Sequence, residues 1–332
     1  MITLGPSRRE LVDPFACSFY SFNMPSMVEQ IPVRSHAKLR FISRGATSWV
    51  YRVEQDLVLK IARDRATNAF KHENTIYDEL EQHGPCPYLL QSILRLPRLN
   101  FLPVMGWGSL EQLIKNSQRR GSGGEIDVLH TVSQTQAEQW AMEMAGAMAW
   151  LESMGYVHGD LRPANMLIDD TDHVKLADFD SVCRIGSPCP GSAPPWARVL
   201  GDEAGPDKGT FGTNGPRTEQ FAFGSILYTI TRGLEPYEDE RDSVKVLDWL
   251  QDMVFPSLGE SGTDGIIGRC WRGLYPSIKS LFEETTQLEG TSTLSQPTVL
   301  SVEDISALRE RCNRLLDDEL KEALRDFCVF ET

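Results

Sequence analysis

The chain has 332 residues, of which 41% are hydrophobic, and carries a formal net charge of −14. This length and apolar content exclude a fully disordered chain and suit a two-lobed globular protein with a sizeable core. The acidic charge argues against nucleic acid as the main partner, and we interpret it as a solvated acidic surface.

Targeting signals and cysteine usage indicate the cellular location of the protein. No apolar run is long enough to span a bilayer, and residues 1–34 lack the apolar core of a signal peptide. The seven cysteines include no C-x-x-C pair, so we expect reduced thiols rather than a disulfide framework or a zinc site. These features predict a cytoplasmic or nuclear protein with no membrane partner, and they leave the oligomeric state open.

The first third of the chain predicts an extension and then a small lobe. Residues 1–35 hold several Pro and Ser and few periodic apolar positions, so we expect a flexible N-terminal extension. Short apolar runs between residues 39 and 61 predict three strands. A helix near 68–82 and strands at 90–96 and 100–105 would complete an N-lobe over residues 36–105.

The remaining chain predicts a larger helical lobe over residues 106–285. Residues 116–134 are polar and rich in Gly and Ser, which indicates a loop insertion. Helices are predicted at 136–154 and 218–231, and the second is apolar all round, as expected at the centre of a lobe. A polar linker over 286–300 then precedes a charged helix over 301–328, where Ser301 and Asp304 form a capping-box-like pair.

The most informative segment reads Y-V-H-G-D-L-R-P-A-N-M-L-I at 156–168, with V-K-L-A-D-F-D at 174–180. It places Asp160, Asn165 and Asp178 beside apolar, strand-like residues. A carboxylate that orients a hydroxyl, with an amide and a second carboxylate that hold metal ions, suits phosphoryl transfer. Asp and Asn are also ordinary turn residues, but two linked motifs at this spacing favour the catalytic interpretation.

These motifs resemble the catalytic loop, H-R-D-x-x-x-x-N, and the magnesium loop, D-F-G, of the eukaryotic protein kinase superfamily. Three later motifs follow in the order of that family: T-E-Q-F-A-F-G-S-I-L-Y at 218–228, G-L-E-P-Y at 233–237 and I-I-G-R-C-W at 266–271. The resemblance covers about residues 38–285 and is to a divergent, fungal-type member. It implies an α+β bilobal fold with a small antiparallel β-sheet N-lobe, one helix in that lobe, and a larger, mainly helical C-lobe.

The resemblance also implies roles for the catalytic residues. Asp160 would orient the acceptor hydroxyl, and Asn165 and Asp178 would hold Mg²⁺. Arg162 stands where Ser/Thr kinases usually carry Lys, and would keep a positive charge near the γ-phosphate of ATP. Lys60, in L-V-L-K-I-A, matches the lysine that binds the α- and β-phosphates.

The family pairs that lysine with a glutamate on the next helix, for which Glu73 and Glu79 are the candidates. The inward stripe of the predicted helix is apolar and consists of Phe70, Ile76, Tyr77 and Leu80. Glu73 falls within this stripe, whereas Glu79 points away from it. A carboxylate on an apolar face needs a partner because burying it alone is costly, so we expect Glu73 to pair with Lys60.

The phosphate-covering loop departs from its family pattern, because G-x-G-x-x-G becomes S-R-G-A-T-S at 43–48. Gly45 is the only glycine retained, and the loss of the other two removes backbone freedom. We still expect Ser43, Gly45, Ser48 and Val50 to contact the nucleotide.

The hinge is read from G-S-L-E-Q-L-I at 108–114, which resembles the hinge-to-helix segment of the family. Counting back places Leu102 at the gatekeeper position. Pro103 would offer its carbonyl to adenine, and Met105 its N–H and carbonyl; a proline is tolerated where no donor is needed.

Other departures bear on regulation. Gly159 replaces the arginine that pairs with a phosphorylated activation segment, so we expect activity not to need that phosphorylation. Asp180 replaces the glycine of D-F-G and predicts a stiffer or altered switch. The A-P-E motif is not recognisable, and Gly215-Pro216-Arg217 stands at about its place. Glu219 replaces a buried Asp that ties its helix to the catalytic loop.

The resemblance therefore implies an ATP- and Mg²⁺-dependent kinase that phosphorylates Ser or Thr of protein substrates. A pseudokinase scaffold is the first alternative, favoured by the altered loop and Asp180 and opposed by the retained ionisable residues. A small-molecule phosphotransferase related to aminoglycoside or choline kinases is the second, and the late motifs disfavour it. Selectivity for Ser/Thr over Tyr stays open because Arg162 removes the usual indicator.

Overall fold

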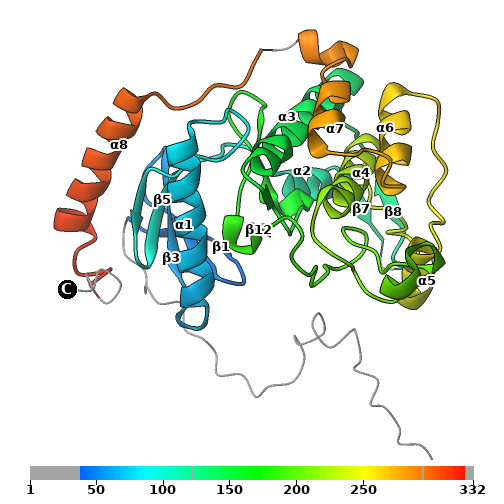
Figure 1. The fold of residues 1–332 in the computed structure, drawn as a ribbon. Helices are drawn as coiled ribbons and strands as arrows, with labels where there is room; N and C mark the ends of the chain where they lie inside the picture. The colour runs from blue at the N-terminus through cyan, green and yellow to red at the C-terminus, as the bar shows by residue number, and fades with distance from the viewer. Residues whose placement is uncertain (1–37, 122, 294, 326–332) are drawn as a thin grey trace, which may run out of the picture.

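The computed structural model describes residues 38–121, 123–293 and 295–325. The predicted N-terminal extension at 1–35 lies outside the described residues. Within them, an antiparallel sheet with one long helix is followed by a larger, mainly helical lobe (Figure 1). This arrangement confirms the predicted α+β bilobal fold class.

The N-lobe is built on a five-stranded antiparallel sheet in the order β1-β2-β3-β5-β4. The strands are β1 Arg40–Arg44, β2 Ser48–Arg52, β3 Leu57–Ala62, β4 Leu94–Leu96 and β5 Leu99–Pro103. Helix α1, Thr67–His83, follows β3. The strand predicted at 90–96 begins later, at Leu94, because the Leu90 amide instead donates to the carbonyl of Leu176 at 2.9 Å.

All six residues of β3 are buried because both faces of the sheet are covered. Alternating side chains of a strand point to opposite faces. Leu57, Leu59 and Ile61 belong to the apolar cluster that includes the C-terminal tail, the described residues from 301 to 325. Val58 belongs to the cluster that includes α1. Lys60 shares the face of Val58, which directs its side chain toward α1.

Helix α8, Val302–Arg314, covers the outer face of this sheet, so that the sheet lies between α1 and α8 (Figure 1). Its N-cap is the predicted Ser301, whose hydroxyl accepts the Asp304 amide at 3.0 Å. The predicted helix over 301–328 changes character after Arg314, passing into a π-helical turn, Leu315–Glu319, and then into irregular turns up to 325. Residues 326–328 of this prediction lie outside the described residues. This break lets Leu320 and Leu324, both fully buried, pack into the same cluster as the sheet.

The C-lobe helices begin at polar caps or at proline, which is why they start where they do. They are α2 Leu110–Asn116, α3 Gln134–Ser153, α4 Pro216–Arg232, α5 Ser243–Gln251, α6 Gly262–Trp271 and α7 Ile278–Thr285. Every residue of α4 from Glu219 to Ile230 is buried, which confirms the helix predicted at the lobe centre.

Short strands hold the loops beside the lobe junction. They are β6 Gly108–Ser109, β9 Tyr156–Val157, β10 Met166–Ile168, β11 Val174–Leu176 and β12 Cys183–Arg184. The β10–β11 hairpin pairs the end of the sequence motif that contains Asp160 with the start of the motif that contains Asp178. Antiparallel pairing therefore returns the second motif to the side of the first.

The structure differs from the loop expected at 116–134, where β7, Gln118–Arg120, pairs with β8, Ile126–Val128. The Gly121 amide donates to the carbonyl of Glu125 at 2.9 Å and closes the hairpin. Arg119 and Asp127 form an ion pair across it at 2.7 Å. The glycines that indicated a loop are the turn of this hairpin, and the polar residues beside them are its exposed strands.

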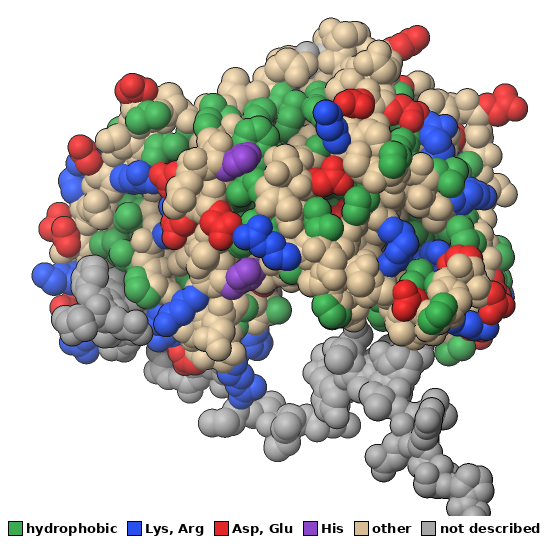
Figure 2. Space-filling view, in the orientation of Figure 1, with side chains coloured by type: hydrophobic (Ala, Val, Ile, Leu, Met, Phe, Trp, Pro, Cys, Tyr) green, Lys and Arg blue, Asp and Glu red, His purple; other side chains and the backbone are tan. Residues whose placement is uncertain are grey.

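The linker at 286–300 runs from the C-lobe to the N-lobe and is anchored along its length. The Gly290 amide donates to Glu138 at 2.6 Å, and Lys175 donates to the carbonyl of Thr298 at 2.9 Å. At its N-lobe end the Leu300 amide donates to Gln91 at 2.7 Å. Basic and acidic side chains are interspersed over the face in Figure 2. Of the helices in the described ranges, none has the length and apolar content to cross a bilayer.

Candidate active site

The predicted lysine–glutamate pair is formed. Lys60 Nζ lies 2.7 Å from Glu73 Oε1 and 2.8 Å from Oε2, and both side chains are buried. Burial raises the pKa of Glu73, and the Lys60 ammonium opposes that rise. Glu79, the other candidate, instead accepts the hydroxyl of Tyr156 at 2.6 Å. The apolar stripe of α1 therefore pointed to the glutamate that contacts Lys60 in the structure.

Asp178 joins this pair from the other lobe. Its Oδ1 lies 2.7 Å from Lys60 Nζ. Partial desolvation raises the pKa of the Asp178 carboxyl, but the ammonium of Lys60 outweighs it, with help from Arg162, and holds the pKa below its usual range. Asp178 has a left-handed backbone with φ of 67°, a sparsely populated conformation for a non-glycine residue that is often found at functional sites.

Aromatic packing connects these charges across the lobe junction. The ring of Phe179 is fully buried and meets the ring of Tyr77, on α1, edge to face at 5.0 Å. The centroid of the Phe179 ring also lies 5.9 Å from that of the His158 ring. A buried aromatic stack fixes Asp178, the neighbour of Phe179, relative to α1.

The catalytic-loop residues form a second constellation. Asn165 Nδ2 donates to the Asp160 carbonyl at 2.9 Å and to its carboxylate Oδ2 at 3.1 Å. Asp160 is half-buried, so its carboxylate is reachable by a substrate. The Ala177 amide donates to the Asn165 carbonyl at 2.9 Å, which ties this loop to the residue before Asp178.

Glu219, at the start of α4, supports the loop from below. The amides of His158 and Gly159 donate to its carboxylate at 2.9 and 3.3 Å. Burial raises the pKa of Glu219, and the His158 amide and side chain oppose that rise. His158 also contacts the carbonyl of Ala177 at 3.1 Å. Both residues hold the loop in place without facing the reacting groups.

Gly159 has the backbone that its residue type requires. Its φ is +79°, and a Cβ at this position would lie 2.6 Å from the carbonyl oxygen of Ser181. Any side chain would therefore collide with the segment after Asp178. The backbone of Gly159 lies directly against the backbone of Ser181, which leaves no room for the arginine side chain found in the family.

The phosphate-covering loop is the turn between β1 and β2. The Gly45 amide donates to the Ser48 carbonyl at 2.8 Å, and Arg63 donates to the Gly45 and Ala46 carbonyls at 2.9 and 3.0 Å. Ser43 and Gly45 are exposed, Val50 is half-buried, and Ser48 is buried. Among the four predicted contacts, Ser43 and Gly45 are therefore the ones most accessible to a phosphate.

The hinge residues lie at the end of β5. Leu102 is buried and pairs with Val58, while the Pro103 carbonyl and Met105 follow at the lobe junction. The Met105 carbonyl accepts the Gly108 amide at 3.1 Å. A carbonyl has two lone pairs, so this bond leaves acceptor capacity at the position predicted to meet adenine.

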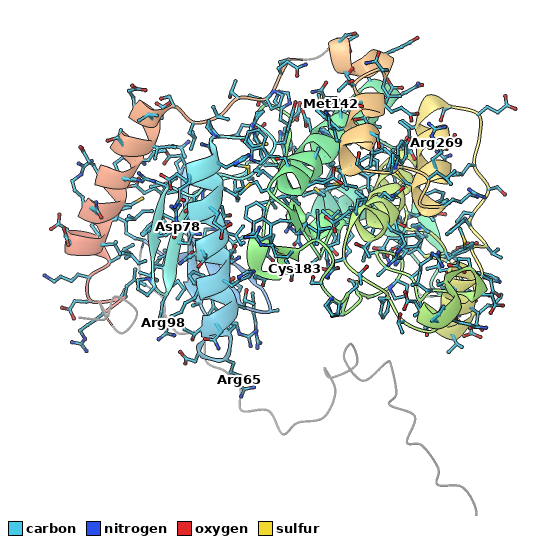
Figure 3. All side chains as sticks on the ribbon, in the orientation of Figure 1. Arg65, Asp78, Arg98, Met142, Cys183 and Arg269 are labelled. Carbon is cyan, nitrogen blue, oxygen red and sulfur yellow. The ribbon has the colours of Figure 1, made fainter. Side chains whose placement is uncertain are left out.

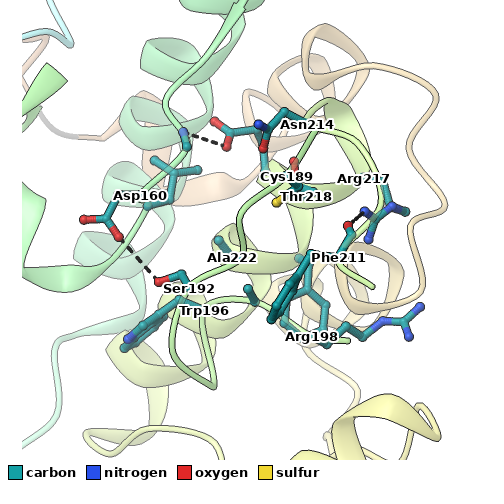
Figure 4. Close-up of a pocket in the computed structure, with 16 residues that line it drawn as sticks. Asp160, Cys189, Ser192, Trp196, Arg198, Phe211, Asn214, Arg217, Thr218 and Ala222 are labelled. Atoms are coloured by element: carbon teal, nitrogen blue, oxygen red, sulfur yellow. Dashed lines mark hydrogen bonds between the residues drawn. The ribbon is translucent and has the colours of Figure 1, made fainter. Parts of the chain in front are cut away.

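A small pocket lies behind Asp160 and was not foreseen (Figure 4). Within it Ser192 Oγ lies 3.5 Å from Asp160 Oδ1. Its wall includes Trp196 and Phe211, from the long segment at 181–215, and Arg217, in the first turn of α4. That segment is rich in Gly, Pro and Ser and has no periodicity, so nothing in the sequence indicated which of its hydroxyls reaches Asp160.

Asp180 is the acidic residue closest in sequence to Asp178. Burial raises the pKa of the Asp180 carboxyl, and the Asp178 carboxylate adds to the rise, while hydrogen bonds from Ser181 and Thr47 oppose it. Thr47 belongs to the phosphate-covering loop. Asp180 therefore links this loop to the segment after Asp178.

The donor set fits a hard divalent cation that is held largely by phosphate. Asp178 offers a carboxylate that is 40% exposed, and Asn165 a side-chain amide. Within the described ranges no three His, Cys, Asp or Glu side chains gather as a metal site. Mg²⁺ bound through phosphates needs only one or two protein ligands, so these two residues suffice for it.

Comparison with known proteins agrees with this geometry. The family model for protein tyrosine and serine/threonine kinases matches residues 46–187. The chain is 25% identical to the 3-phosphoinositide-dependent protein kinase 1 of Arabidopsis thaliana, over 71% of this chain and 48% of that protein. It is 26% identical to mitogen-activated protein kinase kinase 7 of the same plant, over 49% of this chain and 52% of that protein. A shorter match, 40% identical over 20% of this chain and 6% of the relative, is to the Rho-associated protein kinase let-502 of Caenorhabditis briggsae. The chain thus spans about half the length of the first two curated relatives.

Proposed function

The chain belongs to the eukaryotic protein kinase superfamily, and from this premise we propose that it is an ATP- and Mg²⁺-dependent protein kinase acting on Ser or Thr of protein substrates. The observation that carries the proposal is the convergence on Lys60 of Glu73 from α1 and Asp178 from the other lobe, at 2.7 Å each. The proposed kinase domain comprises residues 36–285.

In this proposal each ionisable residue has its own role in binding ATP or in transferring the phosphoryl group. Lys60, held by Glu73, binds the α- and β-phosphates. Asp160 orients the acceptor hydroxyl and accepts its proton as the γ-phosphoryl group is transferred, while Arg162 contributes positive charge beside that group. Asn165 and Asp178 would hold Mg²⁺, which neutralises charge on the phosphates when bound.

The remaining nucleotide contacts come from the N-lobe and the hinge. The carbonyls of Pro103 and Met105, with the Met105 amide, would bind adenine. The N-lobe contacts would come from β1, β2 and the turn between them, through Ser43, Gly45, Ser48 and Val50. Of these four residues, Ser43 and Gly45 are the exposed ones, which supports a contact with the nucleotide through them.

Ser192 supports an aliphatic hydroxyl as the acceptor. Its Oγ lies 3.5 Å from the Asp160 carboxylate, so a serine hydroxyl of the chain already reaches the vicinity of the proposed base. A phenol would have to bring a ring into a region already walled by Trp196 and Phe211. This observation favours Ser or Thr over Tyr.

The experiment is Mg²⁺-dependent ATP turnover by purified protein with a mixed peptide library, run beside Asp160→Asn. Turnover that disappears in the variant supports the proposal, and the phosphorylated residue in the preferred peptides decides between Ser/Thr and Tyr. Turnover that survives in Asp160→Asn would contradict the assigned base.

A nucleotide-binding pseudokinase is the second candidate, favoured by Asp180 in place of the family glycine and by the altered phosphate loop. It predicts no turnover, together with a rise in the melting temperature on adding ATP and Mg²⁺. The same purified protein distinguishes the two candidates.

A further inference from the structure

Arg309, on α8, binds two parts of the N-lobe at once. Its Nε donates to the Ile93 carbonyl at 2.7 Å, and its Nη2 lies 2.6 Å from Glu81 Oε1 on α1. A guanidinium holds its donors in a rigid planar fork, so the two contacts fix each other's direction. The C-terminal tail is thereby attached both to the approach to β4 and to α1.

Glu81 is held from a second side. Arg95, on β4, also forms an ion pair with Glu81, and its Nε lies 2.7 Å from Asp78, which is labelled on α1 in Figure 3. Arg95 from the sheet and Arg309 from the tail therefore both form ion pairs with the last two turns of α1.

A shared cavity marks the place where the start of α8 approaches α1. Leu80 of α1 and Cys86, which follows the helix, line a cavity of about 360 Å³ together with Val302 and Ile305 of α8. Arg309 lines the same cavity and reaches from α8 to α1 through Glu81. The ion pair of Arg309 is therefore a direct contact through which α8 can act on the orientation of α1.

α1 carries the glutamate of the proposed active site. Glu73 precedes Glu81 by eight residues, or about 12 Å along a helix. A helix moves as a rigid element, so a tilt at Glu81 shifts Glu73 against Lys60. The Lys60–Glu73 distances of 2.7 and 2.8 Å leave little room for such a shift, and a displacement of about 1 Å at a catalytic group can cost about 100-fold in rate.

We propose that Arg309 is a positioning residue: through Glu81 it holds α1 where Glu73 pairs with Lys60, and so couples the C-terminal tail to phosphoryl transfer. The inference rests on the proposed kinase function. Arg309 and Glu81 are 39% and 48% exposed, and an exposed ion pair adds little to global stability. Loss of Arg309 should therefore change activity much more than stability.

The test compares Arg309→Ala with Arg314→Ala, a matched control on the same helix. Arg314 is 64% exposed, and within the described part of the chain its ion-pair partner is Glu310, one turn back on α8, at 4.0 Å. Arg309→Ala should lower kcat about 10-fold or more while the melting temperature changes by no more than about 2 °C, and Arg314→Ala should change neither. Arg309→Lys, which keeps the charge but lacks the fork, should recover part of the loss. Equal activities of the two alanine variants would overturn the proposal.

A cycle with Glu73 tests whether Arg309 acts through it. In a Glu73→Gln background, Arg309→Ala should cause no further loss of kcat, because the pairing that Arg309 maintains is already gone. Additive losses would mean that Arg309 acts by another route, which would overturn the proposal.

Hydrogen exchange of α1 separates this proposal from the proposed function. Amides at 70–77 should exchange faster in Arg309→Ala than in the unmodified protein or Arg314→Ala, whether or not the protein turns over ATP. Absent turnover with faster exchange would reject the kinase proposal and support the tail-to-α1 coupling. Unchanged exchange would overturn the coupling even in an active enzyme.

Discussion

The buried carboxylate of Glu219 accepts the backbone amide of His158 at 2.9 Å, so that the central helix of the C-lobe holds the loop that carries Asp160. The Gly159 amide donates to the same carboxylate at 3.3 Å. The position of Asp160 is thus fixed through its backbone from below.

Removing this support should destabilise the protein and slow turnover. Glu219→Ala leaves the buried amide of His158 and the half-buried amide of Gly159 without an acceptor, at about 1–3 kcal/mol for a fully buried amide. We expect the free energy of unfolding, measured with urea, to fall by about 2–4 kcal/mol. Glu219→Gln retains an amide oxygen and should lose less; an equal loss in both variants would contradict this reading of the contact.

Asp160→Asn tests the proposed base with little structural cost. The amide keeps the size of the side chain and can still bond Asn165, but it cannot take a proton at neutral pH. We expect kcat to fall by about 100- to 10,000-fold, with the melting temperature and its shift on adding ATP and Mg²⁺ unchanged. Loss of that shift would indicate a role in nucleotide binding instead.

Lys60 neutralises a carboxylate that lies wholly inside the protein. Lys60→Met leaves Glu73 buried without its cation and should lower the free energy of unfolding by about 3–5 kcal/mol. Adding Glu73→Gln should restore most of that stability without restoring turnover. Calorimetry of the single and double variants measures their stability. A double variant that is no more stable than Lys60→Met would contradict the idea that Lys60 stabilises the protein by neutralising Glu73.

Gly159→Ala should cost more than backbone strain alone. Gly84 provides the comparison, because it also has a positive φ, +111°, but no atom lies within 4 Å of a Cβ placed there. Gly84→Ala should lose about 1–2 kcal/mol, and Gly159→Ala should lose more because its Cβ meets the Ser181 carbonyl at 2.6 Å. Equal losses in urea unfolding would show that the loop relaxes freely.

Glu235 should make stability depend on pH. Burial and the Glu238 carboxylate raise its pKa to about 7. Because the folded pKa lies above the unfolded value, stability is fully present below about pH 4.5 and is lost as pH rises to about 7. Glu235→Gln should therefore raise the free energy of unfolding at pH 8 by about 1 kcal/mol, discounted because Glu235 is partly exposed, and leave it unchanged at pH 4. A gain of equal size at both pH values would point to a cause other than ionisation.

The sequence predicted the parts of this protein that follow from local pattern. The period of α1 placed Glu73 inward, and the apolar content of the segment at 218–231 placed α4 at the centre of its lobe. Both predictions depend on which face of one helix is apolar, and that information lies within a few turns of chain.

The rest depends on contacts between segments far apart in the sequence. Ser192 reaches Asp160 from a segment without periodicity, and Arg309 reaches Glu81 from the far end of the chain. The sequence predicted a charged terminal helix without indicating what it covers, whereas Cys312 on α8 and Leu315 just after it are buried against the sheet. The assigned roles of Lys60, Asp160, Asn165 and Asp178 remain predictions that the variants above can test.

The cover supplied by α8 has a consequence for biosynthesis. A ribosome makes the N-lobe strands first and the helix that completes their packing last. Until Cys312 and Leu315 have been added, the face of the sheet that carries Trp49, Leu59 and Phe101 has no partner from the tail. We expect the nascent chain to present that face to chaperones throughout synthesis of the C-lobe, since transiently exposed apolar surface favours aggregation. The lobe that begins folding first is therefore the one that finishes last.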